Sequence, residues 1–312
     1  MPASKIGFIG LGLMGHGMAR NLAGAGVDLL VFDTDPSAVK RLVESGAKAA
    51  TSIGELARQS RVVFTSLPGP VQVEEVVLGR DGILENTSAG KVLFDLSTIS
   101  LTLARRIHEA FKQKGAHMLD APISGGPAGA ASGELAIWVG GEKDVFERNL
   151  DLLHMVAKSP CYVGATGAGT VTKLVHNLTG YMFQLTFAET FSLGVKAGVD
   201  PLDLWEALHL GLVGKGSPLN MLTKQFLPGK YEQPSFRLKG GHKDVGLATA
   251  MARELGVPMR LANMTLEEMT EGMARGWGEH DARAFLQLQL ERAGVRIAVD
   301  PGRLEAAIKA VS

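Results

Sequence analysis

The chain has 312 residues, of which 46% are hydrophobic and 21% charged, as in globular proteins long enough to form two domains. Its 32 basic and 32 acidic residues give a formal net charge of zero, so no overall field favours nucleic acid or an anionic membrane, and we expect a small-molecule partner. The single cysteine, Cys161, excludes an internal disulfide framework. Because the first residues show no signal-peptide pattern, we expect a cytoplasmic protein.

Short apolar runs alternate with amphipathic segments through the first half of the chain. The runs that we predict as strands cover residues 5–10, 29–32, 62–67, 91–96, 117–121, 135–140 and 160–164. A helix is expected between the last two of them, at 142–158. This rhythm of strand and helix predicts an α/β domain built on a doubly wound parallel sheet.

From residue 167 onward the pattern is entirely helical. The predicted helices cover residues 171–198, 201–210, 218–226, 239–255, 260–276 and 281–293, and the tail after Gly294 has no clear pattern. The most apolar segment, 177–199, contains Gln184, Glu189 and Lys196, so it fits a buried helix better than a membrane span. We therefore predict an α/β domain at 1–164 and an all-helical domain at 165–312 that begins with a long inter-domain helix.

A GxGxxG motif follows the first predicted strand and opens a helix. Its glycines Gly10, Gly12 and Gly15 suit a tight turn, room for a pyrophosphate beside the backbone, and close packing of helix on strand. The alternative is that these glycines serve turns only. The predicted cofactor-binding loop consists of Gly10, Leu11, Gly12, Leu13, Met14 and Gly15.

An acidic residue, Asp33, follows the second predicted strand, roughly 20 residues beyond the glycines, where a carboxylate binds the ribose hydroxyls in Rossmann-type domains. That carboxylate would repel a 2'-phosphate, and no arginine comes directly after it. We therefore predict a Rossmann-type dinucleotide-binding domain that prefers NAD to NADP.

Further candidates lie at the carboxyl ends of later strands, the edge at which open parallel sheets bind ligands. Leu67 and Pro68 follow one strand, and Thr98 follows the next. We predict that all three contact the cofactor, with Thr98 on the nicotinamide side. The alternative for Thr98 is to cap the helix that begins near Ser100.

The glycine-dense segment 120–135 offers a substrate site. In Ser124-Gly125-Gly126, a hydroxyl and exposed backbone amides suit a carboxylate without supplying a formal charge. A plain turn is the alternative, and the residues alone do not decide between the two.

The segment GAGTVTKLVHN, residues 167–177, places Lys173, His176 and Asn177 as neighbours on one helix. A lysine desolvated beside a cofactor has a lowered pKa, which suits it for proton transfer. From the residues alone we favour the plainer alternative, in which Lys173 reaches water and the other two side chains satisfy an inter-domain surface.

Four segments together resemble, in order and spacing, the beta-hydroxyacid dehydrogenase family, which includes 3-hydroxyisobutyrate dehydrogenase. They are GFIGLGLMGHGMARNL, DAPISGGPAGAASGEL, GAGTVTKLVHN and FRLKGGHKDVGLA. The resemblance covers nearly the whole chain. It implies a Rossmann domain followed by a helical domain for substrate and oligomer contacts, which forms homodimers or homotetramers.

The resemblance also implies roles for residues. Lys173 would transfer a proton to or from the substrate oxygen, Asn177 would orient the substrate, and Ser124, Gly125 and Gly126 would hold its carboxylate. Lys243, before Asp244, would lie near cofactor and substrate.

Two features do not follow the pattern of one subfamily. One departs from the members most similar in motif, and the other does not distinguish between subfamilies. His176 lies in a KLVHN run that is more similar to 6-phosphogluconate dehydrogenase, and we assign it to substrate binding. The loop at 211–220 lies where family members differ and is expected to contact the variable part of the substrate.

These observations predict an NAD-dependent oxidoreductase that transfers a hydride between nicotinamide and a short 3-hydroxy acid, similar to 3-hydroxyisobutyrate, with Lys173 as general acid and base. One alternative is an NAD(P)H-dependent reductase of a small semialdehyde such as tartronate semialdehyde, or of glyoxylate. Another is a non-catalytic NAD-binding scaffold. No metal is expected, since the eight histidines form no HxxxH or similar ligand cluster and there is one cysteine.

Overall fold

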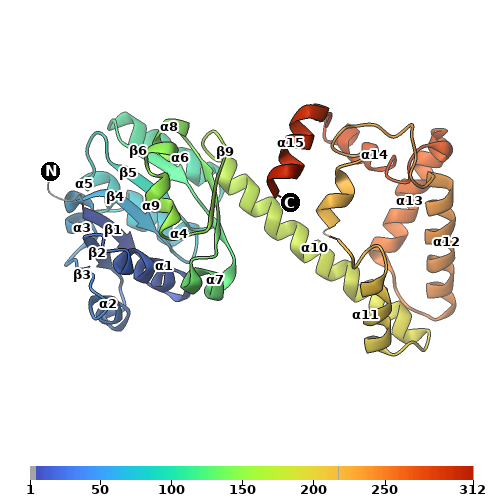
Figure 1. Ribbon diagram of the computed structural model, residues 1–312, viewed down its shortest axis with the longest axis horizontal. Helices are drawn as coiled ribbons and strands as arrows, with labels where there is room; N and C mark the ends of the chain where they lie inside the picture. Colours follow the sequence, from blue (N-terminus) through green and yellow to red (C-terminus); the bar gives the residue numbers. More distant parts are fainter. Residues whose placement is uncertain (1–4, 217, 312) are drawn as a thin grey trace. The chain divides into compact units, whose positions relative to one another are not determined.

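The computed structural model describes residues 5–216 and 218–311. The chain divides into two compact units, 1–179 and 180–312, and the long helix α10 (Ala168–Lys196) contributes to both (Figure 1). The boundary predicted after residue 164 lies before α10, whereas the two units divide after residue 179, within that helix. Within the described ranges, no helix combines the length and apolar character needed to cross a bilayer.

The first unit contains a nine-stranded sheet, which confirms the doubly wound α/β fold. Its strands run in the order β3-β2-β1-β4-β5-β6-β8-β7, with β9 beside β8. They are β1 (Lys5–Ile9), β2 (Leu29–Phe32), β3 (Lys48–Ala49), β4 (Ser60–Thr65), β5 (Val92–Asp95), β6 (His117–Asp120), β7 (Ile123–Ser124), β8 (Ala136–Gly140) and β9 (Ser159–Gly164).

The sheet is parallel from β3 to β6, but β8 is antiparallel to both β6 and β7. The predicted doubly wound sheet is therefore mainly parallel, with antiparallel pairs at this edge. Parallel neighbours need a long crossover, whereas only the short helix α7 (Gly126–Ser132) separates β7 from β8, so the chain doubles back. The helix expected at 142–158 is likewise split into α8 (Lys143–Arg148) and α9 (Leu150–His154).

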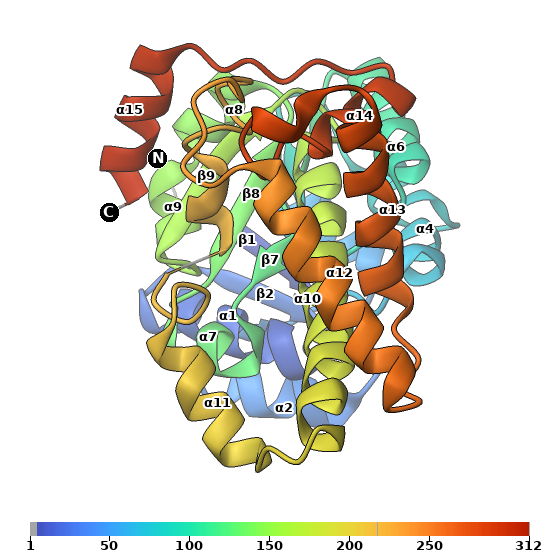
Figure 2. The ribbon, with the colours of Figure 1, turned by 90° about the vertical axis from the view of Figure 1, so that its right-hand side faces the viewer.

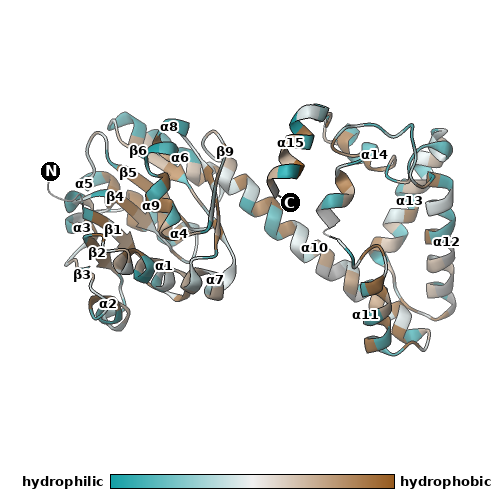
Figure 3. Cartoon of the chain, viewed as in Figure 1, coloured by the Kyte–Doolittle hydropathy of each residue, from teal (hydrophilic) through white to brown (hydrophobic). Residues whose placement is uncertain are grey.

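Alternate residues of the central strands enter two hydrophobic cores, one on each face of the sheet. Phe8, Phe64 and Phe94 lie in register on one face and stack with ring centroids 6.0 and 5.5 Å apart. Their neighbours Ile9 and Val63 are buried on the other face. In Figure 3 these strands are largely brown because most of their residues are apolar, as expected of strands buried on both faces.

Helices cover both of these cores. The face with the phenylalanine stack is covered by α1 (Leu13–Gly24), α2 (Pro36–Val43), α8 and α9. The opposite face is covered by α3 (Ile53–Gln59), α4 (Pro70–Leu78), α5 (Ile83–Asn86) and α6 (Leu101–Gln113). This arrangement leaves the carboxyl ends of β1, β4 and β5 at one edge, where the sequence places its candidate residues.

Helices make up the second unit. They are α11 (Pro201–Leu210), η1 (Pro218–Leu222), α12 (Leu238–Glu254), α13 (Arg260–Ala274), η2 (Trp277–Glu279), α14 (Leu286–Arg292) and α15 (Pro301–Val311). Helices α12 and α13 lie side by side, as Figures 1 and 2 both show. The tail without a clear sequence pattern thus contains a helix, α15.

Two predicted helices of this unit are shorter than expected. The helix expected at 218–226 is only the 3-10 turn η1, because the chain turns back shortly afterwards and the Leu227 carbonyl accepts the Val299 amide at 2.7 Å. The helix expected at 281–293 begins at Leu286. The fully buried Asp281 carboxylate accepts the backbone amides of Ser235 and Arg283, which holds the preceding residues in a turn.

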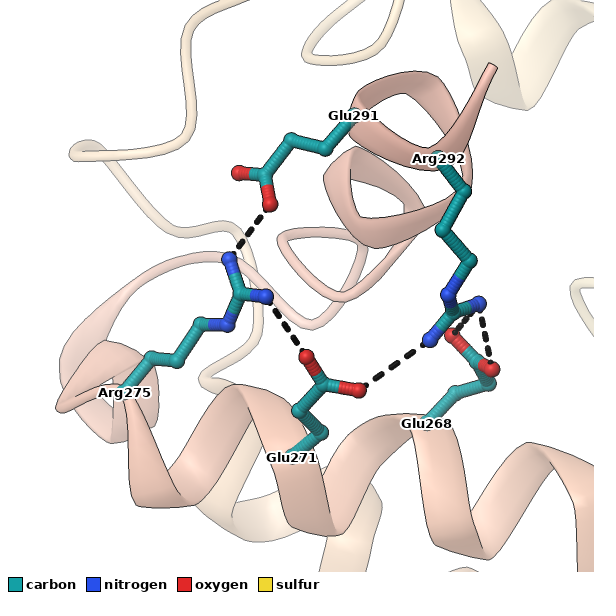
Figure 4. Close-up of polar contacts among 5 residues, drawn as sticks. All are labelled: Glu268, Glu271, Arg275, Glu291 and Arg292. Atoms are coloured by element: carbon teal, nitrogen blue, oxygen red, sulfur yellow. Dashed lines mark hydrogen bonds and ion pairs between the residues drawn. The ribbon is translucent and has the colours of Figure 1, made fainter. Parts of the chain in front are cut away.

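Charged side chains join the helices of the second unit. The Glu189 carboxylate on α10 accepts the first backbone amides of α13, including that of Leu261 at 2.9 Å, and so caps that helix from outside. Ion pairs among Glu268, Glu271, Arg275, Glu291 and Arg292 connect α13 with α14 (Figure 4). Because this network is exposed, salt screens it.

Candidate functional site

The three motif glycines meet three different surroundings. Gly10 has φ +91°, and a Cβ there would lie 2.3 Å from the Ser66 carbonyl oxygen. A Cβ on Gly15 would lie 1.8 Å from the Gly10 carbonyl oxygen, so helix α1 packs directly on the turn. Beside Gly12 nothing lies within 4 Å among the described residues. A turn, a close packing contact and open space at the start of a helix fit a dinucleotide pyrophosphate.

A cavity of about 560 Å³ lies over this turn and extends to the end of β2. Its lining includes Gly10, Gly12, Leu13, Met14, Gly15, Asp33, Leu67 and Pro68. The Asp33 carboxylate accepts the Leu11 amide at 2.6 Å and the Asp35 amide at 2.8 Å, which holds it at the cavity wall. All the cofactor residues predicted in the first unit except Thr98 thus gather at this cavity, with Leu11 contributing through its amide.

Basic side chains close to this turn were not predicted from the sequence as part of the site. The Nδ1 atom of His16 on α1 is buried without a hydrogen-bond partner among the described residues. Burial lowers the pKa of His16, and the positive charges of Arg41 and Arg20 lower it further. Arg41 lies on α2, eight positions after Asp33, and no local motif marks it.

A second cavity, of about 320 Å³, adjoins the first. The two share Met14, Ser66, Leu67 and Pro68. The second is also lined by Leu96, Ser97, Thr98, Ile123, Ser124, Gly125, Gly126 and Lys173. The structure therefore brings the predicted lysine, the serine-glycine turn and Thr98 together beside the cofactor cavity.

Thr98 is exposed at this cavity and does not cap the next helix. Ser100 caps α6 instead, since its hydroxyl accepts the Leu103 amide at 3.2 Å. At the end of β5, three residues before Thr98, the buried Asp95 carboxylate accepts the Thr65 hydroxyl at 2.8 Å and the Ser97 amide at 3.1 Å. Burial raises the pKa of Asp95. This buried network holds the ends of β4 and β5 together beneath the cavity.

Ser124 lies at the end of β7, where its hydroxyl and the Nε2 atom of His176 are 3.2 Å apart. The His176 ring also contacts Trp138, with centroids 4.9 Å apart. The turn continues through Gly125 and Gly126, both with positive φ. His176 is thus held beside the predicted carboxylate site, which leaves its contact with substrate a prediction.

Lys173 lies on the second turn of α10 and is half-buried. Its Nζ atom has neither an ion-pair nor a hydrogen-bond partner among the described residues, and burial lowers its pKa. Asn177, one turn later, is also half-buried but is not among the residues that line either cavity. Its predicted contact with substrate stays a prediction.

Two predicted features belong to the second unit. Lys243, on α12, is exposed and forms an ion pair with Asp244 at 2.8 Å, so its predicted contact with the cofactor remains a prediction. In the loop 211–220, Val213 and Gly214 line an apolar pocket with Trp205 and His209, while Ser217 lies outside the described residues. Over the described ranges, no three His, Cys, Asp or Glu side chains gather in a way that suits a metal ion.

Comparisons with known proteins identify the family of this chain. The family model described as the NAD binding domain of 6-phosphogluconate dehydrogenase matches residues 5–167. The model described as the NAD-binding domain of NADP-dependent 3-hydroxyisobutyrate dehydrogenase matches residues 167–289. Together they span the Rossmann domain and most of the helical part.

Individual relatives match over nearly their full length. The 2-(hydroxymethyl)glutarate dehydrogenase of Eubacterium barkeri is 35% identical over 94% of this chain and 97% of its own. The 3-hydroxyisobutyrate dehydrogenase of Pseudomonas aeruginosa is 35% identical over 92% and 97%. A crystal structure of a putative oxidoreductase from Mycobacterium avium superposes with a TM-score of 0.73 at 31% identity, covering 88% of this chain and 98% of that one. The chain therefore belongs to the NAD(P)-dependent beta-hydroxyacid dehydrogenases of the 3-hydroxyisobutyrate dehydrogenase type.

Proposed function

We propose that this dehydrogenase oxidises the hydroxyl group of a short 3-hydroxy acid reversibly, with NAD as its cofactor and Lys173 as general acid and base. One observation carries the proposal: the partly desolvated, unpaired Lys173 amine lines the same small cavity as the Ser124 turn and Thr98, beside the dinucleotide cavity. A lysine of this kind is suited to proton transfer near neutral pH.

Lys173 handles the proton of the reaction. When the substrate is oxidised, the neutral amine takes the hydroxyl proton as the carbonyl forms, and in reduction the ammonium returns it to the carbonyl oxygen. Bound nicotinamide supplies the hydride acceptor or donor. Burial favours the neutral amine because a charged group loses hydration there, so the amine is available as a base below the ordinary lysine pKa.

The substrate carboxylate is assigned to the turn from Ser124 to Gly126. The turn lines the cavity with a hydroxyl and exposed backbone, groups that bind an anion without a counter-charge. A cavity of about 320 Å³ is small, which favours a compact hydroxy acid. The named relatives are dehydrogenases of 3-hydroxyisobutyrate and of 2-(hydroxymethyl)glutarate. Both acids carry a hydroxyl group on a carbon that is β to a carboxylate.

The decisive experiment follows NADH formation by absorbance with a panel of 3-hydroxyisobutyrate, 3-hydroxypropionate, glycerate, serine, 2-(hydroxymethyl)glutarate, 4-hydroxybutyrate and 6-phosphogluconate. Turnover of a short 3-hydroxy acid is expected. Lys173→Met should lower kcat by about 10²-fold or more while the Kd for NADH stays unchanged, since general acid–base catalysis contributes about that much. A Lys173→Met variant with near wild-type turnover would exclude the lysine role.

Measurement in both directions separates the proposed activity from its closest alternative. Reduction of tartronate semialdehyde or glyoxylate with NADH or NADPH, without appreciable hydroxy-acid oxidation, would favour a semialdehyde reductase using the same residues. NADH binding without turnover of any compound would favour the non-catalytic scaffold instead.

We further propose that the enzyme is a cytoplasmic homodimer or homotetramer assembled through its second unit. Large apolar side chains remain exposed on α11, among them Leu202 at 61% and Trp205 at 53%. Contiguous exposed apolar side chains favour a protein interface. Multi-angle light scattering after gel filtration measures the assembly directly.

A further inference from the structure

The helix that carries Lys173 begins without a capping side chain of its own. Its first residue is Ala168, and the residue before it is Gly167, with φ +93°. The first backbone N–H groups of a helix have no partner inside the helix and need an acceptor from elsewhere. Ser, Thr, Asp or Asn normally supplies it from the position that Gly167 occupies.

Here the acceptor comes from the sheet. The two carboxylate oxygens of Asp120, at the end of β6, accept the Gly167 amide at 2.7 Å and the Thr170 amide at 2.6 Å. Asp120 is only 1% exposed. Burial raises the pKa of Asp120, while the hydrogen bonds from Thr170 and Gly167 act in the opposite direction. Bonds from amides to a buried carboxylate are short and strong.

The start of α10 is also pressed against the sheet. A Cβ on Gly169 would lie 2.3 Å from the Trp138 carbonyl oxygen and 2.5 Å from that of Asp120. A Cβ on Gly140, in β8, would lie 2.8 Å from the Gly169 nitrogen. Only glycine permits this approach, so the first turn of the helix has little freedom to shift against β6 and β8.

A second polar contact lies on the other side of Lys173. Ser124, four residues after Asp120, lies 3.2 Å from His176 on the same helix. The short segment 120–124 therefore contacts α10 at Thr170 and at His176, three residues before and three residues after Lys173. Each of these positions is three residues from Lys173 and so is its neighbour along the helix.

We propose that Asp120 is a positioning residue, which anchors the start of α10 so that the Lys173 amine keeps a set place relative to Ser124. Asp120 acts through the helix and does not line either cavity. The proposal depends on the function proposed for Lys173. In this proposal, the segment 120–124 holds the first turns of α10 at two points. Asp120 binds the helix start, and Ser124 contacts His176 one turn beyond Thr172.

The test uses two variants of the full-length enzyme and one control. Asp120→Asn keeps one oxygen acceptor but replaces the other with an NH₂ group, which cannot accept a hydrogen bond from a backbone amide. Gly169→Ala leaves Asp120 intact but pushes the start of α10 away from the sheet. This variant replaces Asp120→Asn in the test if Asp120→Asn does not fold. The control is Glu189→Gln, which alters another carboxylate that caps a helix from outside and lies on α10 16 residues after Lys173.

Three readouts are combined. Hydrogen exchange followed by mass spectrometry reports on the amides of Gly167 and Thr170. The pH dependence of Lys173 acetylation by acetic anhydride reports the pKa of its amine without any turnover. Steady-state kinetics and NADH titration give kcat, KM and the cofactor Kd.

In Asp120→Asn we expect faster exchange at Gly167 and Thr170, and Lys173 acetylation that requires a higher pH because the released amine is better hydrated. The kcat should fall by about 10- to 100-fold, the usual cost of misplacing a catalytic group by about 1 Å, with the Kd for NADH unchanged. Glu189→Gln should show none of these changes.

Unchanged exchange would show that Asp120 is no anchor. Faster exchange with normal kcat and an unchanged acetylation profile would show that the anchor does not position Lys173. Either result overturns the proposal. Should the wild-type enzyme oxidise no hydroxy acid, the proposed function fails separately, because exchange and acetylation still decide whether Asp120 controls Lys173.

Discussion

Two alanine substitutions in the cofactor loop should have opposite consequences. Gly12→Ala adds a methyl group where nothing lies within 4 Å, and the backbone at Gly12, with φ −65°, accepts any L-residue. Gly15→Ala adds one that would lie 1.8 Å from the Gly10 carbonyl oxygen and 3.2 Å from the Phe8 ring. One change intrudes on the space proposed for the pyrophosphate, and the other intrudes on the packing of helix α1 against the sheet.

The size of each effect follows from this geometry. Ordinary contact begins at 3.4 Å, so Gly15→Ala forces a movement of about 1.6 Å between helix and turn. Overpacking of this kind costs about 1–3 kcal/mol of unfolding free energy. Gly12→Ala should change stability by no more than about 0.5 kcal/mol, as for other open surface sites. Its methyl group occupies the proposed pyrophosphate space, so NADH should bind at least tenfold more weakly, a loss of about 1.4 kcal/mol.

Urea unfolding followed by circular dichroism measures the first quantity, and NADH fluorescence titration measures the second. Gly12→Ala should leave the urea midpoint unchanged and lose affinity, while Gly15→Ala should lower the midpoint. Wild-type NADH affinity in Gly12→Ala would refute the placement of the pyrophosphate beside Gly12. Wild-type stability in Gly15→Ala would refute the packing argument.

Four further outcomes are expected. Asp33→Asn should raise the ratio of kcat/KM for NADP over NAD by about tenfold, because repulsion of the 2'-phosphate disappears; an unchanged ratio would point to Arg41 as the determinant. The oxidation rate should rise with pH through the lowered pKa of Lys173 while the reduction rate falls through the same region, since oxidation needs the neutral amine and reduction the ammonium; two profiles with the same slope would argue against one shared group. Glu189→Gln should lower the unfolding free energy by about 1 kcal/mol, as for other helix caps, measured by urea unfolding, and a stable variant would mean that water replaces the cap. Trp205→Glu should reduce the molar mass in light scattering if α11 forms the interface, and an unchanged mass would place the interface elsewhere.

Much of the first unit follows from local sequence. The strands around Phe8, Phe64 and Phe94 are apolar runs bounded by turns, and burial on both faces explains why they lack alternation. The glycine motif and Asp33 were found because a pyrophosphate loop needs particular residues at particular spacings along one strand, turn and helix. The role predicted for Lys173 came from the family resemblance and stays a prediction, since a lysine on a helix carries no local sign of what its amine faces.

The errors lie where long-range contacts override local preference. Residues 218–226 have a helical pattern, yet Leu227 pairs with Val299, and the start of α14 is delayed by Asp281. The strand β8 runs antiparallel to β7 because the connection through α7 is too short for a parallel crossover.

The sequence by itself determined most strands of the first unit, the glycine loop proposed to bind the cofactor, and the residue types that can bind ligands and transfer protons, because each depends on neighbours along the chain. Only the tertiary structure decided which of these groups meet. Asp120 reaches amides 47 and 50 positions away, and Arg41 approaches His16 from a different helix. Contacts of this kind depend on how strands and helices are packed, and no local period or spacing encodes them.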